Sequence, residues 1–211
     1  MSILTFPTLS RGPSLVEWGL VGNTQTHESP FDRTTQTLEM PGARWSASVT
    51  WNNMPLADHR KLAAFLASLR GRAGRFYFSP PQGWRRSTAT LNVATTKVAG
   101  AGQTGSALNG DGFPTSTVIF EQGDWISVQD ASDRPFLYQV TSQTSTDPSG
   151  GATINIAPPL RSSPADNAVI YFDLPLYSVF MLADDRQGRF VHDGMRPDKA
   201  STTIEIIEAL T

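Results

Sequence analysis

Apolar and polar residues alternate strictly across residues 45–52. Trp45, Ala47, Val49 and Trp51 fall on one side, and the serine, threonine and asparagine residues between them fall on the other. A period of two is typical of a strand with one buried and one exposed face. The pattern therefore predicts a strand here.

The period changes after Pro55. Within residues 56–70 the large apolar side chains follow helical spacing, at Leu62, Phe65, Leu66 and Leu69. This spacing predicts an amphipathic helix of about four turns that ends in a left-handed stop at Gly71. Because four buried side chains do not offset the entropy lost on ordering such a segment, we expect the helix to cover a sheet. A strand-like run at residues 75–78 follows it.

The remaining segments predict short strands separated by turns. Residues 1–44 predict one or two strands and a long polar loop over 23–37, and residues 87–112 are poor in large apolar side chains. From residue 118 to 172, short apolar runs alternate with Gly, Pro, Asp and Asn, as in small barrels and sandwiches. Residues 177–183 are apolar on both faces, as in a central strand, 192–200 predict a loop, and 202–210 predict the last strand.

The shift in composition predicts two domains, one inserted into the other. Proline-rich seams lie at residues 79–81 and between 158 and 175. Domain termini are often close together, which makes insertions easy to tolerate. We therefore expect a mainly β chain: a β-sandwich belt domain with one amphipathic helix (1–83 plus 172–211) and an inserted small β-barrel, OB-like (84–171).

Composition restricts the classes of function. The 211 residues carry a net charge of −2, 17 glycines, 15 prolines and no cysteine. The absence of cysteine excludes disulfides and thiolate metal sites. No run approaches the eighteen or so apolar residues of a membrane span, and the first residues do not resemble an export signal, so we expect no membrane association.

Candidate chemistry is sparse. The three histidines, His27, His59 and His192, do not have metal-ligand spacing, and no nucleophile or phosphate-binding motif occurs. The glycines at 100, 102 and 105 have dinucleotide-binding spacing but precede no helical pattern. Acidic clusters coincide with predicted turns. We expect neither an enzyme nor a cofactor, although a pocket with convergent carboxylates would favour an enzyme.

Basic residues gather in one stretch. Between Asp58 and Asp111 there are eight basic and no acidic residues. The stretch could be a solvated surface, an interface with another copy or a partner, or a nucleic-acid site, for which stacking aromatics are mostly missing. The candidate interface residues are Arg60, Lys61, Arg70, Arg72, Arg75, Arg85 and Arg86.

Two tryptophans raise a different function. Trp84 and Trp125 belong to the inserted unit and could face a saccharide, since small barrels can bind oligosaccharides. A carbohydrate-binding module that aids host attachment is therefore an alternative. A buried Trp125 at the start of a strand is the competing interpretation.

Several motifs together resemble the distal tail protein of long-tailed bacteriophages. They are residues 41–45 (PGARW), 65–77 (FLASLRGRAGRFY), 123–125 (GDW) and 156–161 (IAPPLR). The resemblance implies a hexameric ring at the tail tip of the virion, in which belt domains join the tail tube protein to the tail hub protein and the receptor-binding apparatus. It further implies that DNA passes through the lumen without specific binding. Another tail ring, a terminator or tube protein, is the alternative within this class.

Overall fold

The computed structural model describes residues 3–80, 89–173, 176–185, 190–193 and 196–210. The chain divides into two compact units, Met1–Tyr77 with Phe180–Thr211 (unit 1) and Phe78–Val179 (unit 2). With 44% of residues in strands and 9% helical, the predicted mainly β class is confirmed, and the sheets are consistent with a β-sandwich. The predicted seams at 83/84 and 171/172 both lie inside unit 2.

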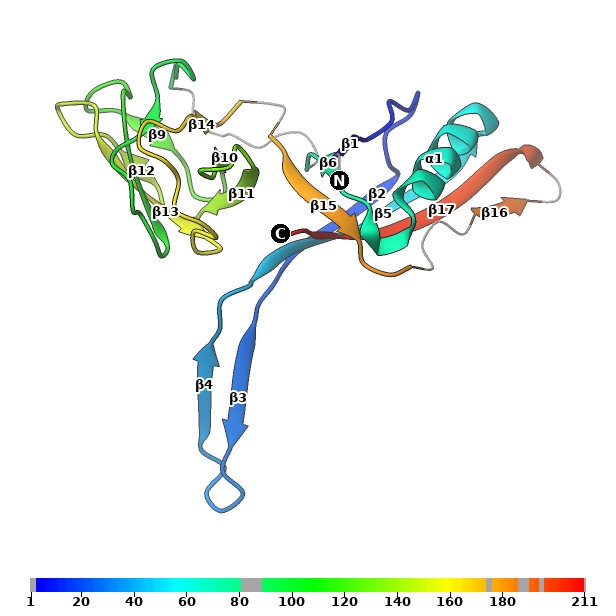
Figure 1. Cartoon of the computed structure of the whole chain (residues 1–211), viewed down its shortest axis with the longest axis horizontal. Helices are drawn as coiled ribbons and strands as arrows, with labels where there is room; N and C mark the ends of the chain where they lie inside the picture. The colour runs from blue at the N-terminus through cyan, green and yellow to red at the C-terminus, as the bar shows by residue number, and fades with distance from the viewer. Residues whose placement is uncertain (1–2, 81–88, 174–175, 186–189, 194–195, 211) are drawn as a thin grey trace. The chain divides into compact units, whose positions relative to one another are not determined.

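Unit 1 is built on one seven-stranded sheet (Figure 1). Its strand order is β1-β6-β15-β17-β5-β2, and β16 pairs with β17 outside this path. The strands are β1 (Leu4–Thr5), β2 (Leu15–Val21), β5 (Arg44–Pro55), β6 (Phe76–Phe78), β15 (Ser178–Leu182), β16 (Phe190–Asp193) and β17 (Arg196–Glu208). The long strand β5 is antiparallel to β2 on one side and to β17 on the other.

The alternation on β5 is confirmed. Trp45, Ala47, Val49 and Trp51 are buried, whereas the residues that alternate with them are more accessible. The helix α1 (Leu56–Leu69) follows directly and contacts β5 and β17. Of the predicted stripe, Leu62, Leu66 and Leu69 are buried and Phe65 is half-buried, because these positions share the side of the helix that faces the sheet.

An aromatic cluster joins the helix to the sheet. The Phe65 ring meets Phe6 edge-on, with centroids 5.2 Å apart, and Phe76 at 5.5 Å. Phe6 also stacks on Trp51 at 6.1 Å. Aromatic pairs in these geometries stabilise beyond their buried area, by about 0.5–1.5 kcal/mol each.

The helix ends slightly earlier than the sequence predicts. Arg70 is already left-handed, with φ 54°, and its N–H donates to the carbonyl of Ala67. Gly71, the predicted stop, also has positive φ and begins the short 3₁₀ turn η1 (Gly71–Ala73). The prediction was wrong by one residue because glycine is the usual but not the obligatory left-handed residue.

Two predicted loops contain strands. The polar segment 23–37 forms much of a hairpin of β3 (Thr24–Glu28) and β4 (Thr35–Glu39), and 192–200 contributes to β16 and β17. Hydrophobic periodicity missed the hairpin because neither of its faces is buried. The 192–200 prediction failed because pairing between β16 and β17 decides the conformation there.

Unit 2 is a six-stranded sheet in the order β14-β10-β11-β13-β8-β7, with a separate β12-β9 pair. A bridge between Lys97 and Val169, with a hydrogen bond of 2.9 Å from the Val98 N–H to the Ala168 carbonyl, connects the two ends of this order. The sheet therefore closes on itself, whereas the likeness to an OB fold stays a prediction. The strands are β7 (Lys97–Val98), β8 (Ala107–Asp111), β9 (Val118–Phe120), β10 (Trp125–Gln129), β11 (Pro135–Val140), β12 (Thr144–Ser145), β13 (Ala152–Ala157) and β14 (Ile170–Tyr171).

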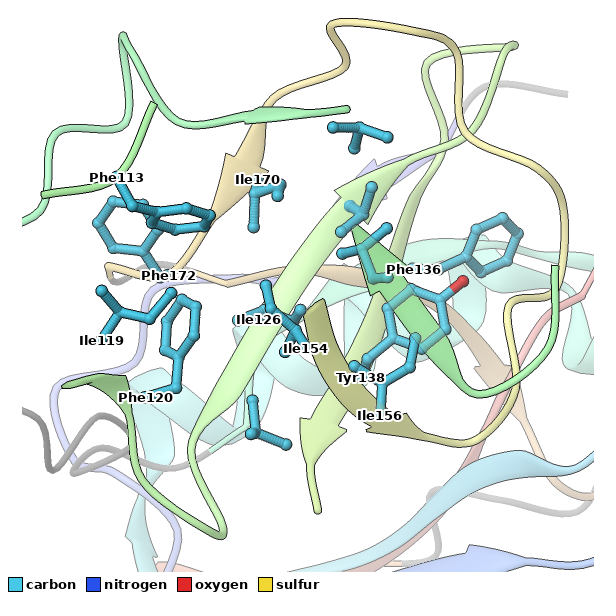
Figure 2. Packing of buried hydrophobic residues seen from close by; sticks show 14 residues of the cluster. Phe113, Ile119, Phe120, Ile126, Phe136, Tyr138, Ile154, Ile156, Ile170 and Phe172 are labelled. Atoms are coloured by element: carbon cyan, nitrogen blue, oxygen red, sulfur yellow. The ribbon is translucent and has the colours of Figure 1, made fainter. Parts of the chain in front are cut away.

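The closed sheet of unit 2 surrounds its own hydrophobic core. Figure 2 shows Phe113, Phe120 and Phe172 gathered at one side of this core, with Tyr138 and Ile156 farther away. The Phe113 and Phe120 rings meet edge-on at 6.1 Å. Unit 2 thus has the separate core expected of a domain.

The packing of α1 predicts a clear cost for shortening Leu62, which is fully buried. Leu62→Ala should lower the free energy of unfolding of unit 1 by about 2–5 kcal/mol, since it removes buried methyl groups and leaves a cavity. The exposed substitution Ala67→Gln on the same helix should change it by less than about 0.5 kcal/mol. Guanidinium unfolding followed by tryptophan fluorescence measures both, and equal stability of the two variants would contradict this packing.

Candidate functional site

Four of the predicted interface residues are exposed along α1 or directly after it. Arg60 and Lys61 lie in the second turn of α1, whereas Arg70 and Arg72 lie at its C-terminal end, and all four are exposed. We call these four residues the basic helix face. Arg85 and Arg86 lie outside the described residues.

Arg75 has a local structural role. It is half-buried, and its Nη1 donates to the carbonyls of Arg72, Ala73 and Gly74 at 2.8, 3.2 and 3.1 Å. These bonds satisfy carbonyls that η1 leaves without helical partners. This guanidinium nitrogen holds the turn after the helix, and the interface role of Arg75 stays a prediction.

A buried carboxylate ties the N-terminal segment to α1. Asp58 is 2% exposed, and its Oδ2 accepts hydrogen bonds from the Ser10 hydroxyl and, at 3.0 Å, from the Ser10 N–H. The hydroxyl bond, together with the backbone bond and the nearby charge of Lys61, lowers the pKa of Asp58 although burial opposes this. Asp58 is therefore a structural link beneath the basic helix face.

The most exposed element of unit 1 is one that sequence reasoning missed. Strands β3 and β4 extend beyond the β2–β5 end of the sheet as a two-stranded ribbon (Figure 1), and each of their residues is exposed. We call residues 23–41 the hairpin arm. At its base, the Asn23 Nδ2 donates to the Pro41 carbonyl at 2.6 Å and the Met40 N–H donates to the Asn23 carbonyl at 2.7 Å.

The tip of the arm is ordered by its own hydrogen bonds. The Ser29 N–H donates to the Thr34 carbonyl at 2.9 Å, and the Arg33 N–H donates to the Ser29 carbonyl at 3.0 Å. Asp32 accepts from the Thr34 hydroxyl at 2.9 Å, and hydrogen bonds from Ser29 and Thr34 lower the pKa of Asp32. This turn presents the Phe31 side chain, which is 97% exposed.

Exposed apolar side chains concentrate on the arm and the strand that leads into it. Among the described residues, eight large hydrophobic side chains are exposed, and six of them lie between residues 15 and 40. These six are Leu15, Leu20, Val21, Phe31, Leu38 and Met40. Single exposed apolar residues are common on protein surfaces, so the side chain of most interest is Phe31, which is almost fully exposed at the ordered tip. The only sequence signal for the arm was this phenylalanine in a polar segment.

The predicted sugar-facing aromatics do not form a site. Trp125 is 7% exposed at the start of β10, so the prediction that its ring could stack on a saccharide was wrong. The competing interpretation, a buried ring at a strand start, holds. Trp84 lies outside the described residues.

The acidic residues of unit 2 turns have structural partners. Asp147 accepts from the Ser149 hydroxyl and N–H and from the Gly151 N–H, and these bonds lower its pKa. Burial would raise the pKa of Asp130, but hydrogen bonds and the charge of Arg134 outweigh it and lower the pKa. Both carboxylates are thus accounted for by turn geometry, which the sequence predicted for the cluster that contains Asp130.

The described residues show neither a metal-ion cluster nor a helix that could span a membrane. They contain no group of three or more His, Cys, Asp or Glu residues placed to hold a metal ion. The helices in this part of the chain are too short or too polar to cross a membrane.

The Asp58 contact predicts a pH dependence of stability. A carboxylate with a lowered folded-state pKa stabilises the fold above its unfolded pKa of about 3.9, and this contribution disappears as the pH falls through the folded value. Asp58→Asn should therefore be less stable than the unaltered protein at pH 7, and the difference should shrink below about pH 4. Ser10→Ala should act in the same direction. Thermal unfolding at several pH values measures this, and a pH-independent difference would contradict it.

An ordered tip presents one phenylalanine on an exposed arm, and a separate helix face of the same unit presents four basic side chains. Comparison of the sequence with protein-family models and with curated proteins gives no match.

Proposed function

We propose that this protein is a structural component of a phage virion that assembles into a ring at the distal end of the tail, where it joins the tail tube to the tail-tip hub and the receptor-binding apparatus. The observation that carries this proposal is the hairpin arm. Its strands are exposed at every position and its tip holds Phe31 in water.

An arm of this kind favours association with another protein. Two-stranded hairpins without a covering layer are marginally stable in water, and exposed strand edges are sites for pairing with another chain. The arm is an uncovered hairpin with exposed strand edges, and its tip is ordered by hydrogen bonds. Burial against another protein removes the exposed apolar area from water.

The placement at a tail tip rests on the sequence resemblance. The division of the chain into two units, with the second inserted into the first, supports it, because the resemblance implies a belt domain that carries an inserted barrel. The partners in this proposal are further copies of the chain, the tail tube protein and the tail hub protein. DNA would pass through the ring without specific binding.

The proposal predicts self-association of the purified chain. Mass photometry over a range of concentrations should show species of several 22.9 kDa chains, with a hexamer of about six chain masses as the closed form. Negative-stain electron microscopy should show rings. A monomer at every concentration, with no rings, would contradict the ring-forming role.

The virion location is tested separately by immunogold labelling of phage particles from cells that carry the gene. Gold at the tail end opposite the head is expected. Labelling confined to cell debris would exclude the tail-tip assignment and leave self-association unaffected.

A further inference from the structure

We infer that the hairpin arm of one copy docks on the basic helix face of the next copy, so that the chain associates head to tail. This inference rests on the self-association proposed above. It names the two surfaces that meet.

The arm has two chemically different faces. Residues directly opposite in an antiparallel pair share a face, and successive residues alternate between faces. The pairs Thr24–Glu39, Thr26–Thr37 and Glu28–Thr35 therefore form one face, with four threonines and two glutamates. The pairs Gln25–Leu38 and His27–Gln36 form the other face, which has no acidic residue. One face of the arm is thus acidic and the other is not.

The two surfaces have opposite charge. The arm holds three acidic residues, Glu28, Asp32 and Glu39, and one basic residue, Arg33. Residues 59–77, which include the basic helix face, hold five basic residues and no acidic residue, and one carboxylate from elsewhere in the chain, Asp185, lies at the C-terminal end of this face, where it accepts the Arg72 N–H at 2.8 Å. Complementary charge of this kind aligns partners and excludes wrong pairings. Because both surfaces belong to the same chain, a second copy supplies what each lacks.

The spacing of the charges also agrees. Glu28 and Glu39 lie at opposite ends of the acidic face, about 13 Å apart along the strands, because Glu39 is opposite Thr24 and four residues separate Thr24 from Glu28. Arg60 and Arg70 are ten residues apart on the helix, about 15 Å along its axis. The separation of the two glutamates therefore matches the axial separation of Arg60 and Arg70 to within about 2 Å.

The contact is compatible with the symmetry of a ring. The arm and the helix face are different surfaces of one unit, so their contact is either exchanged reciprocally in a two-fold dimer or continued from copy to copy. The head-to-tail form closes as a ring, and the ring proposed above requires this form. Phe31, at the tip beyond Glu28, is buried in the same contact and contributes its apolar area.

Reversing the charge of each surface in a separate variant of the full chain tests this inference. Variant one carries Glu28→Lys and Glu39→Lys, and variant two carries Arg60→Glu and Arg70→Glu. Each alone should associate at least about tenfold more weakly than the unaltered chain, measured by analytical ultracentrifugation at low salt. An equimolar mixture should recover association, because each arm then meets a helix face of opposite charge. Phe31→Ser should also weaken association about tenfold or more, with an unchanged melting temperature.

A matched control places new charge on the other face of the arm. Gln25→Lys with Gln36→Lys should change the association constant by less than about twofold. All variants are first checked for the melting temperature of the unaltered chain, so that a folding defect is not taken for a binding defect.

The outcomes separate the inference from the proposed function. If the variants weaken association but their mixture does not recover it, the arm docks elsewhere and the inference fails. If the variants associate normally, the copies meet through other surfaces and only the inference fails. If the unaltered chain is always a monomer, both fail.

Discussion

The antiparallel pairing of β5 with its two neighbours is the constraint on which unit 1 depends. Seven consecutive residues of β2 pair with β5, and β17 pairs with the other edge along most of its length. Because side chains alternate along a strand, this register commits Trp45, Val49 and Trp51 to the same buried face. A shift of one residue would expose all three.

Both candidate interaction surfaces start from this strand. At its C-terminal end β5 leads into α1 without a loop, and at its N-terminal end it follows β4 of the hairpin arm after a short turn. The sheet thus holds the helix through its buried leucines and Phe65, while the exposed side of the helix keeps its basic residues in water. It also holds only the base of the arm, so that Phe31 at the tip stays exposed (Figure 1).

The two units differ in how completely they cover their own apolar side chains and strand edges. Unit 2 closes its sheet around a core of its own, and its turn carboxylates are satisfied by neighbouring N–H and hydroxyl groups. Unit 1 leaves an edge strand and a hairpin with exposed apolar residues, an arrangement that natural proteins usually avoid or cover. That contrast places the expected protein contacts on unit 1.

The sequence by itself determined the elements whose faces are unequally buried: the strand at residues 45–52, the helical stripe of Leu62 and Leu66, and the mainly β class with an inserted unit. These follow from periodicity, which records burial directly. Only the tertiary structure decided the hairpin arm, the local role of Arg75 and the burial of Trp125. The arm has no buried face to leave a hydrophobic pattern, and the surroundings of Arg75 and Trp125 depend on how the chain folds around them. Hydrophobic periodicity indicates which residues are buried. The exposed surfaces proposed to bind partners depend instead on which strands pair with each other.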